Sequence, residues 1–254
     1  MQPHCGGKRR KVSSKSRVAL VTGAASGIGA AIAQRLEDDG WNVLTVDVRG
    51  EVGFTADLTT REGNAGAVST AVERFGRLDA VIPNAGFQHV APVSEFPEDR
   101  WDAILALLLT SPFLLARHAW PHLVSAGEGR FVAIASVHGL VASPFKSAYV
   151  SAKHGVLGLV KTLALEGAAQ GISATAVCPG YVRTPLVEAQ IADQARAHGT
   201  PEERVLEEVI LAPHAVKRLI EPEEVAAVVA FLLGPDGRAF TGAPVTMDQG
   251  WTAR

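Results

Sequence analysis

Cysteine is nearly absent from the sequence: Cys5 and Cys178 are the only two in 254 residues. Two cysteines placed so differently cannot provide a disulfide framework or the ligands of a structural zinc site. We therefore expect no metal, and the lack of a disulfide framework favours a reducing compartment such as the cytoplasm.

An excess of charge of one sign is also lacking. Lysine and arginine number 24 against 26 aspartates and glutamates, for a net charge of -2, so composition gives no reason to expect a nucleic-acid partner. No apolar segment long enough for secretion or for spanning a bilayer follows the polar first sixteen residues, and we expect no membrane association. Residues 1–16, which include Lys8-Arg9-Arg10-Lys11, are expected to form a disordered basic tail.

The remaining chain, residues 17–254, is expected to form one domain, because it shows no repeat and the sequence, at 47% hydrophobic residues, can bury a sizeable core. Short apolar runs alternate with helix-periodic segments. This alternation predicts an α/β fold, a doubly wound parallel sheet of the Rossmann type with its site at the carboxyl ends of the strands. Residues 186–219 are polar and are broken by Gly199, Pro201 and Pro213, which favours a mobile helical lid over the substrate.

A glycine-rich turn, Gly23-Ala24-Ala25-Ser26-Gly27-Ile28-Gly29, follows the first expected strand and precedes a helix expected from about Ala30. Strand, glycine turn and helix together are typical of a dinucleotide site, because backbone N–H groups at the helix start face the pyrophosphate and glycines let the backbone approach it. The cofactor contacts expected here are Gly23, Ser26, Gly27, Ile28 and Gly29.

The second expected strand ends near Asp47, about twenty residues after the glycines. A carboxylate at this place can bind the ribose hydroxyls and would repel a 2′-phosphate. The sequence therefore predicts NAD as the cofactor, while Arg49, two residues on, keeps NADP as an alternative.

Further cofactor contacts are expected in the turns after later strands. Asp57 and Leu58 could bracket the adenine ring, or they could instead cap the helix expected from about Thr60 to Phe75. The Asn84-Ala85-Gly86 turn could pass beneath the cofactor. The loop after the sixth strand supplies Pro179, Gly180, Val182 and Thr184, of which Thr184 could bond the nicotinamide amide or cap a helix.

Tyr149 and Lys153 stand one turn apart on an expected helix and so share a face. An ammonium beneath a phenol favours the phenolate, which makes a tyrosine a usable base near neutral pH. Ser136 could hold the substrate oxygen, and the three residues together predict proton transfer in an alcohol/ketone couple. The alternative is an amphipathic helix with a buried tyrosine and a surface lysine.

These motifs, in this order and spacing, resemble the short-chain dehydrogenase/reductase family over about residues 17 to 250. The resemblance rests on Thr22-Gly23-x3-Gly27-Ile28-Gly29, Asn84-Ala85-Gly86, Ser136, Tyr149-x3-Lys153 and Pro179-Gly180. It implies that Tyr149 is the general acid/base, that Lys153 lowers its pKa and holds the nicotinamide ribose, and that Ser136 orients the substrate oxygen during hydride transfer. Since relatives are commonly tetramers, it also implies a homotetramer.

Further segments resemble the branch of the family that interconverts D-3-hydroxybutyrate and acetoacetate, such as Ser136-Val137-His138-Gly139-Leu140 and Met247-Asp248-Gln249-Gly250-Trp251. This resemblance implies a small hydroxy acid as the substrate, with its carboxylate held by Gln88, His138, Lys146 and Gln190. Two amides, an imidazole and an ammonium could satisfy the lone pairs of such a carboxylate. Taken singly, each of the four has a plainer alternative as a surface amide, a solvated loop charge or a histidine bonded to backbone.

The sequence departs from the family pattern at a few positions. Leu108 stands where the family has a catalytic asparagine, and nearby Pro112 predicts a kink in the helix expected from Glu98 through Leu123. Tyr181 stands where the nearest relatives have tryptophan. These departures leave open another 3-oxo or secondary alcohol substrate, or a weakly active NAD-binding relative.

Overall fold

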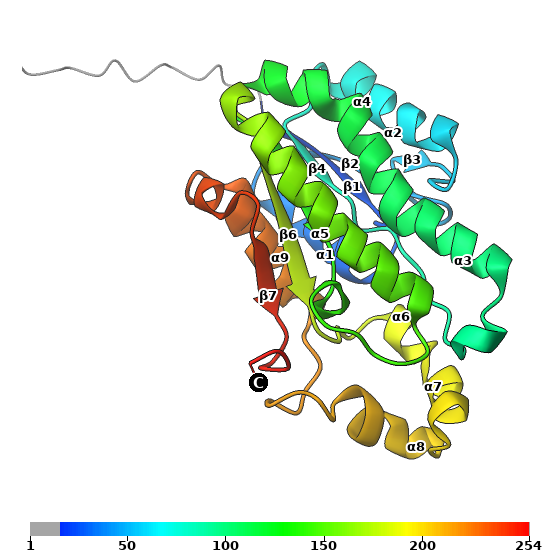
Figure 1. Cartoon of the computed structure of the whole chain (residues 1–254). Helices are drawn as coiled ribbons and strands as arrows, with labels where there is room; N and C mark the ends of the chain where they lie inside the picture. The colour runs from blue at the N-terminus through cyan, green and yellow to red at the C-terminus, as the bar shows by residue number, and fades with distance from the viewer. Residues whose placement is uncertain (1–15, 254) are drawn as a thin grey trace, which may run out of the picture.

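The computed structural model describes residues 16–253, so most of the expected basic tail lies outside the described residues. Within them, one seven-stranded parallel sheet has the order β3-β2-β1-β4-β5-β6-β7 (Figure 1). The strands are β1 Val18–Thr22, β2 Asn42–Asp47, β3 Phe54–Thr55, β4 Ala80–Ile82, β5 Arg130–Ile134, β6 Ser173–Pro179 and β7 Pro244–Met247. The prediction of a doubly wound parallel sheet is confirmed.

Helices cover both faces of this sheet. α2, α4 and α5 lie on one face, and α1 and α9 lie on the other (Figure 1). Their bounds are α1 Gly27–Asp38, α2 Arg61–Phe75, α3 Glu98–Leu105, α4 Ser111–Ala126, α5 Ser147–Gly167, α6 Pro185–Glu188, α7 Ile191–His198, α8 Glu202–Val205 and α9 Pro222–Leu233. α1 begins three residues before the expected Ala30, because the last two glycines of the turn already belong to the helix.

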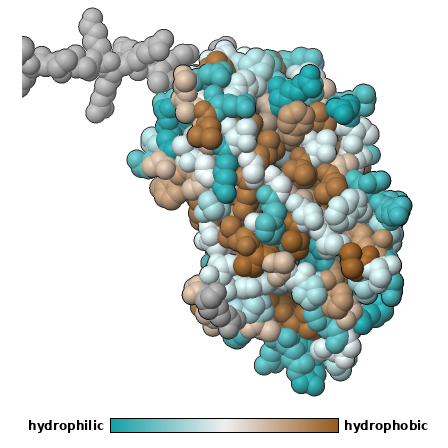
Figure 2. Space-filling model, in the orientation of Figure 1, coloured by the Kyte–Doolittle hydropathy of each residue, from teal (hydrophilic) through white to brown (hydrophobic). Residues whose placement is uncertain are grey.

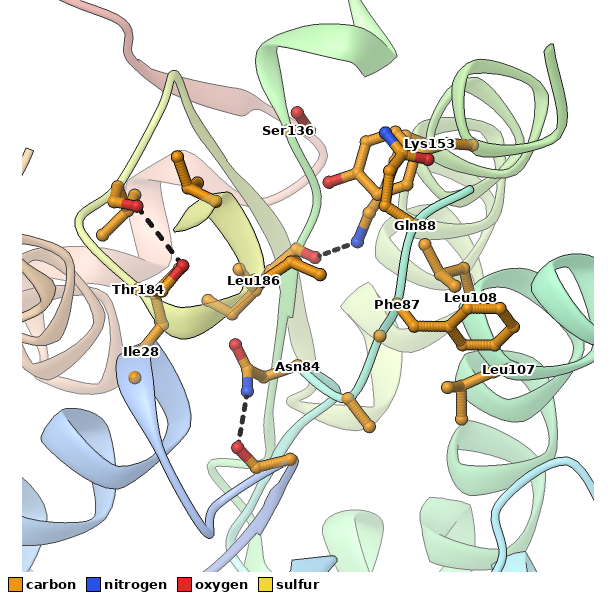
Figure 3. A pocket seen from close by; sticks show the side chains of 18 of the residues that line it. Ile28, Asn84, Phe87, Gln88, Leu107, Leu108, Ser136, Lys153, Thr184 and Leu186 are labelled. Atoms are coloured by element: carbon orange, nitrogen blue, oxygen red, sulfur yellow. Dashed lines mark hydrogen bonds between the residues drawn. The ribbon is translucent and has the colours of Figure 1, made fainter. Parts of the chain in front are cut away.

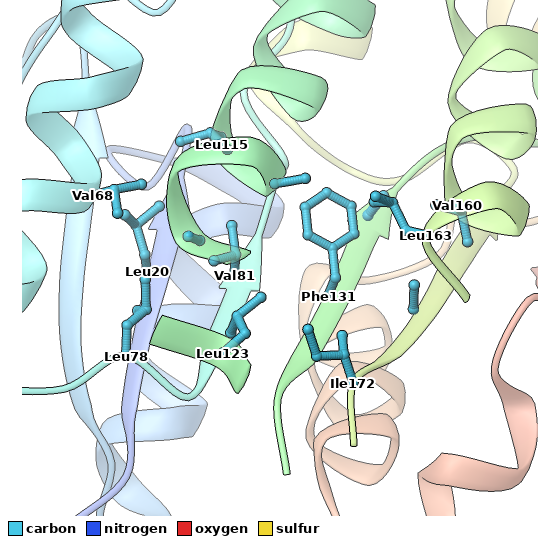
Figure 4. Packing of buried hydrophobic residues seen from close by; sticks show 14 of the residues in the cluster. Leu20, Val68, Leu78, Val81, Leu115, Leu123, Phe131, Val160, Leu163 and Ile172 are labelled. Atoms are coloured by element: carbon cyan, nitrogen blue, oxygen red, sulfur yellow. The ribbon is translucent and has the colours of Figure 1, made fainter. Parts of the chain in front are cut away.

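The strands are buried on both sides. In β1, Val18 and Leu20 pack into the core beneath α2, α4 and α5 (Figure 4), while Ala19 and Val21 pack beneath α1 and α9. All four side chains are fully buried. Because successive side chains of a strand point to opposite faces, a strand covered on both faces reads as one apolar run.

The long helix expected from Glu98 is two helices, α3 and α4, joined by a π-helical turn over Ala106–Thr110. In this turn the N–H of Ser111 donates to the carbonyl of Ala106. Pro112 has no N–H to donate, so the carbonyl of Leu107 loses both of its possible helix donors. The irregularity predicted from Pro112 is confirmed, and it lies just before the proline.

The segment Glu98–Ala126 is long and apolar enough to cross a membrane by length and composition alone, which corrects the expectation that no such segment exists. Its inner side chains, Leu114, Leu115 and Leu123 among them, are buried in the core of this chain. The Ser111 hydroxyl also bonds Asn64 of α2 at 2.7 Å. The segment is therefore packed as a core helix.

The segment expected as a lid consists of α6, α7, α8 and a π-helical turn at Leu206–Ile210. It lies beyond the carboxyl ends of the strands (Figure 1). Its own small core includes Val187, Val205 and Ile210. The helical character of the predicted lid is confirmed, whereas its mobility stays a prediction.

Gly29→Ala should destabilise the fold, because a Cβ at this position would lie 2.1 Å from the carbonyl oxygen of Gly23. We expect a loss of about 1–3 kcal/mol in the free energy of unfolding, as for other overpacked sites. Gly158→Ala is the matched control: it lies in α5 with nothing within 4 Å, and alanine should add about 0.5–1 kcal/mol there. Urea denaturation measures both, and equal stabilities of the two variants would contradict the packing argument.

Candidate active site

A cavity of about 480 Å³ opens at the carboxyl ends of the strands. It is lined by every residue that the sequence predicted for the site except Gly29. The lining residues that were predicted are Gly23, Ser26, Gly27, Ile28, Asp47, Asp57, Leu58, Asn84, Ala85, Gly86, Gln88, Ser136, His138, Lys146, Tyr149, Lys153, Pro179, Gly180, Val182, Thr184 and Gln190. Gly29 is closely packed against the carbonyl of Gly23 within the turn, and its contact with the cofactor stays a prediction.

The glycine turn has a conformation that requires glycine, because other backbone segments pass close to it. Gly23 and Gly27 have positive φ angles of 66° and 56°, a conformation that favours glycine. A Cβ on Gly23 would lie 2.7 Å from the Cα of Ala85. Ser26 makes no side-chain bond at the start of α1, so the first N–H groups of this helix remain open to a ligand. Such an end suits a phosphate or pyrophosphate group.

Polar side chains at the ends of the neighbouring strands form hydrogen bonds with this turn. One carboxylate oxygen of Asp47 accepts from the N–H of Ala25 at 3.1 Å. The Asn84 amide donates to the carbonyl of Thr22 at 2.9 Å. It also donates to the carbonyl of Gly23 at 3.2 Å (Figure 3). Asn84 therefore supports the turn as well as lining the cavity.

The alternative in which Asp57 and Leu58 cap α2 is wrong. The N-cap is Thr60, whose hydroxyl accepts from the N–H of Gly63 at 3.0 Å. Asp57 bonds the N–H and hydroxyl of Thr59 instead, and it lines the cavity with Leu58.

Tyr149, Lys153 and Ser136 meet at the floor of the cavity. Lys153 is buried, and its Nζ donates to the carbonyl of Ile134 at 2.8 Å (Figure 3), so the alternative of a surface lysine is wrong. The ammonium lies 5.6 Å from the centroid of the Tyr149 ring. Burial lowers the pKa of Lys153 to about 8.

The expected lowering of the Tyr149 pKa by Lys153 is not found in this structure. Burial raises the pKa of the Tyr149 phenol, and its hydrogen bond with Ser136 lowers it by less. The physical reason is that burial of a phenolate costs more free energy than its attraction to the Lys153 ammonium contributes. That ammonium lies 5.6 Å from the centroid of the ring and is already bonded to the carbonyl of Ile134.

His138 is a buried histidine that holds Ser136. Its backbone N–H donates to the Ser136 hydroxyl at 3.1 Å, and its Nδ1 lies 3.4 Å from the same oxygen. Its Nε2 lies 2.9 Å from the hydroxyl of Ser143. Burial, aided by the charge of Lys146, lowers the pKa of His138 to about 3. The imidazole is therefore neutral, and both of its nitrogens face serine hydroxyls rather than open space.

Lys146 is a second buried ammonium, with 2% of its surface exposed. Its Nζ donates to the hydroxyl of Tyr181 at 2.6 Å. Across residues 16–253, no acidic side chain forms an ion pair with it, and burial lowers its pKa to about 8. A buried cation without a counter-ion is costly, and an anionic ligand would relieve that cost.

Gln88 and Gln190 bring amides to the same cavity. The Oε1 atoms of both are buried without a hydrogen-bond partner within the protein, while Nε2 of Gln190 donates to the carbonyl of Leu186 at 2.8 Å. Buried polar atoms are nearly always paired. These two amides therefore have hydrogen-bonding capacity left for a ligand, and rotation of an amide can present its N–H to an anion.

Two aromatic residues at this end were not among the predicted contacts, although Tyr181 was expected at the substrate pocket because the nearest relatives have tryptophan there. Tyr181 and Trp251 line the cavity and stack with ring centroids 5.8 Å apart and an interplanar angle of 13°. Tyr181 directly follows the Pro179-Gly180 pair that ends β6, and Trp251 is the fourth residue from the end of the sequence. An aromatic residue placed directly after such a Pro-Gly pair could have indicated from the sequence that Tyr181 lies at the site.

Leu108 occupies the π-helical turn and is buried. A second, small cavity of about 10 Å³ lies beside it and is also lined by Leu107, Ser111, Pro112 and Lys153. This volume is close to that of one water-sized probe. The family asparagine is missing here, but the π turn and Pro112 interrupt the regular helix next to Lys153.

Lys146→Met should raise the free energy of unfolding at pH 7 by about 1–2 kcal/mol, because it removes a buried unpaired charge. The pKa of Lys146 is about 8 in the folded protein against an ordinary 10.5. The folded state therefore binds fewer protons in this window, and the wild type gains stability as pH rises from about 8 to about 10.5. The difference in the free energy of unfolding between Lys146→Met and the wild type should therefore become smaller from about pH 8 to about pH 10.5.

Urea denaturation at pH 7 and at about pH 10 measures this effect. Lys161→Met, an exposed lysine of α5, the helix that Lys146 precedes, is the control and should show no such pH dependence. A Lys146→Met variant that is less stable than wild type at pH 7 would show that the charge is compensated.

Comparisons with known proteins agree with this geometry. Residues 23–252 match a family model described as enoyl-(acyl carrier protein) reductase. The chain is 44% identical to a D-beta-hydroxybutyrate dehydrogenase of Rhizobium meliloti (strain 1021), with 94% of this chain and 100% of the relative covered. It is 41% identical to a protein of the same name from Cupriavidus necator, with 94% and 98% covered.

Solved structures agree as well. An actinorhodin polyketide ketoreductase with NADPH superposes with a TM-score of 0.89 at 32% identity, covering 96% of this chain and 100% of that one. A ligand-free aldohexose dehydrogenase of Thermoplasma acidophilum gives a TM-score of 0.85 at 28% identity, with 94% and 95% covered. With the parallel sheet, the glycine turn and the Ser136, Tyr149 and Lys153 cluster, these matches show that the chain is an oxidoreductase of the short-chain dehydrogenase/reductase family.

Proposed function

We propose that this protein interconverts D-3-hydroxybutyrate and acetoacetate with NAD as the hydride carrier. The observation that carries the proposal is the buried Lys146 ammonium, which has no acidic partner in residues 16–253 and lines the same cavity as Ser136 and Tyr149. A small acid places its carboxylate and its reacting hydroxyl only a few bonds apart. The two relatives named D-beta-hydroxybutyrate dehydrogenases support this choice of acid.

The residues at the other end of the cavity fit a nicotinamide dinucleotide. The open N-terminus of α1 and the cradle at Gly23 suit the pyrophosphate, since side chains would fill that space. Asp47, Asp57 and Leu58 line the place where the adenosine would lie. When bound, the nicotinamide ring accepts or returns the hydride.

Each residue of the catalytic cluster has one task in this proposal. Ser136, held by His138, donates a hydrogen bond to the substrate oxygen. Tyr149 gives its proton to the substrate carbonyl during reduction; during oxidation it takes the proton of the substrate hydroxyl after it has given its own proton to the solvent. Lys153 holds the nicotinamide ribose and lies beside the small cavity at Leu107, through which a proton could pass onward.

At the acid end, Lys146 pairs with the carboxylate, and the amides of Gln88 and Gln190 complete its hydrogen bonds. His138 lines the same cavity and bonds two serines, and its direct contact with the carboxylate stays part of the proposal. A larger thioester or a cyclic alcohol, the alternative substrates, would leave the Lys146 charge uncompensated in the cavity. That cost favours the acid.

Purified enzyme with NAD and D-3-hydroxybutyrate should produce reduced nicotinamide, measured by absorbance. Tyr149→Phe should lower kcat by at least about 100-fold, because it removes the proton acceptor, while cofactor affinity measured by fluorescence titration stays within about twofold. Wild type that is inactive on the acid but active on cyclohexanol or on a 3-oxoacyl thioester would reject the proposal.

Cofactor choice is tested at Asp47, whose carboxylate faces the cavity beside Arg49. Asp47→Ala should raise KM for NAD by about tenfold through the loss of hydrogen bonds. It should also lower the ratio of kcat/KM with NAD to kcat/KM with NADP. Asp38→Ala, on the exposed side of α1, is the control. An unchanged ratio of kcat/KM for the two cofactors would mean that Asp47 does not select NAD.

We extend the proposal to a homotetramer acting in the cytoplasm. Hydrophobic side chains gather on the face that α4 and α5 present (Figure 2). Leu165 of α5 is 82% exposed and Phe113 of α4 is 45% exposed. Large apolar side chains gathered on an open face favour association with another subunit.

A further inference from the structure

The ring of Tyr181 is fixed by its neighbours on several sides. It stacks on Trp251, meets the edge of His138 with ring centroids 6.3 Å apart and lies 5.9 Å from the ring of His214. Its carbonyl accepts from the N–H of Ile220 at 3.0 Å. The place of the phenol oxygen is therefore set by packing, not only by its bond to Lys146.

The hydrogen bond from Lys146 uses only part of what this phenol offers. Nζ is the donor and Oη the acceptor, at 2.6 Å, so the phenol's own proton is free to be donated. Burial raises the pKa of Tyr181, and the group stays protonated at physiological pH. Because Tyr181 and Lys146 both line the cavity, this proton can be donated to a ligand that binds there.

We infer that Tyr181 is a specificity-determining residue, whose hydroxyl donates a hydrogen bond to one carboxylate oxygen of the acid while Lys146 pairs with the same anion. The inference deepens the proposed function and rests on its acid substrate. Lys146 supplies the charge, and the phenol, held by Trp251 and His138, supplies a donor at a fixed place. The pair selects substrates with a free carboxylate over neutral esters of the same size.

Tyr181→Phe tests the inference because it keeps the ring and its stacking and removes only the hydroxyl. We expect KM for D-3-hydroxybutyrate to rise about tenfold, the usual effect of losing a hydrogen bond to a charged group, with kcat within about twofold. KM for the methyl ester should not change. Trp120→Phe is the matched control: it removes an aromatic hydrogen bond, to Gln170 at 3.2 Å, on the exposed side of α4, and it should alter neither KM.

The pH dependence separates direct donation from an effect through Lys146. The pKa of Lys146 is about 8, so at pH 6 the ammonium is charged with or without the Tyr181 hydroxyl. The neighbouring His138 stays neutral there, and burial lowers the pKa of His198. A tenfold rise in KM that persists at pH 6 supports direct donation. A defect that vanishes at pH 6, or that affects the ester equally, would overturn the inference.

Thermal unfolding gives a readout that does not need turnover. D-3-hydroxybutyrate at a fixed concentration should raise Tm of wild type more than that of Tyr181→Phe, since the stabilisation by a ligand increases with the logarithm of its concentration over Kd. Such a difference in an enzyme that fails to oxidise the acid would reject the proposed function and keep only the contact between Tyr181 and a bound carboxylate. Oxidation of the acid with equal KM in both proteins would reject the inference alone.

Discussion

Burial of the sheet on both faces is the constraint on which the rest of this structure depends. β1, β4, β5 and β6 carry almost only small and branched apolar side chains, and helices close over both sides of them. Such strands leave little room for polar groups between the two layers of helices. The parallel strands direct their carboxyl ends to one edge, where the glycine turn, Asn84, Ser136 and the loop after β6 meet.

Two ammonium groups are withdrawn from water at that edge, and they define the two halves of the active site. Lys153 reaches a backbone carbonyl and lies beside Tyr149. Lys146 reaches a phenol. Each has its pKa lowered by burial. A fold that keeps two desolvated cations forgoes stability, which is typical of sites arranged for ligands rather than for the folded state alone.

Local rules were enough for several features. The glycine turn with its helix, the alternation of strands and helices, and the one-turn spacing of Tyr149 and Lys153 were predictable because each depends on residues close in sequence. Local rules failed where several nearby groups compete or where the turn folds back on itself. Thr60 rather than Asp57 or Leu58 caps α2, and a Cβ on Gly29 would meet the carbonyl of Gly23 in the turn folded back over it.

The sequence by itself determined the class of fold and the family resemblance, and nearly all of the site residues that it predicted line the cavity, because periodicity and motif order are written along the chain. Only the tertiary structure decided the electrostatics: which carbonyl Lys153 bonds, that burial raises the Tyr149 pKa, that His138 holds two serines and that Tyr181 accepts from Lys146. These depend on desolvation and on contacts between segments up to tens of residues apart. Neither quantity exists until the chain has folded.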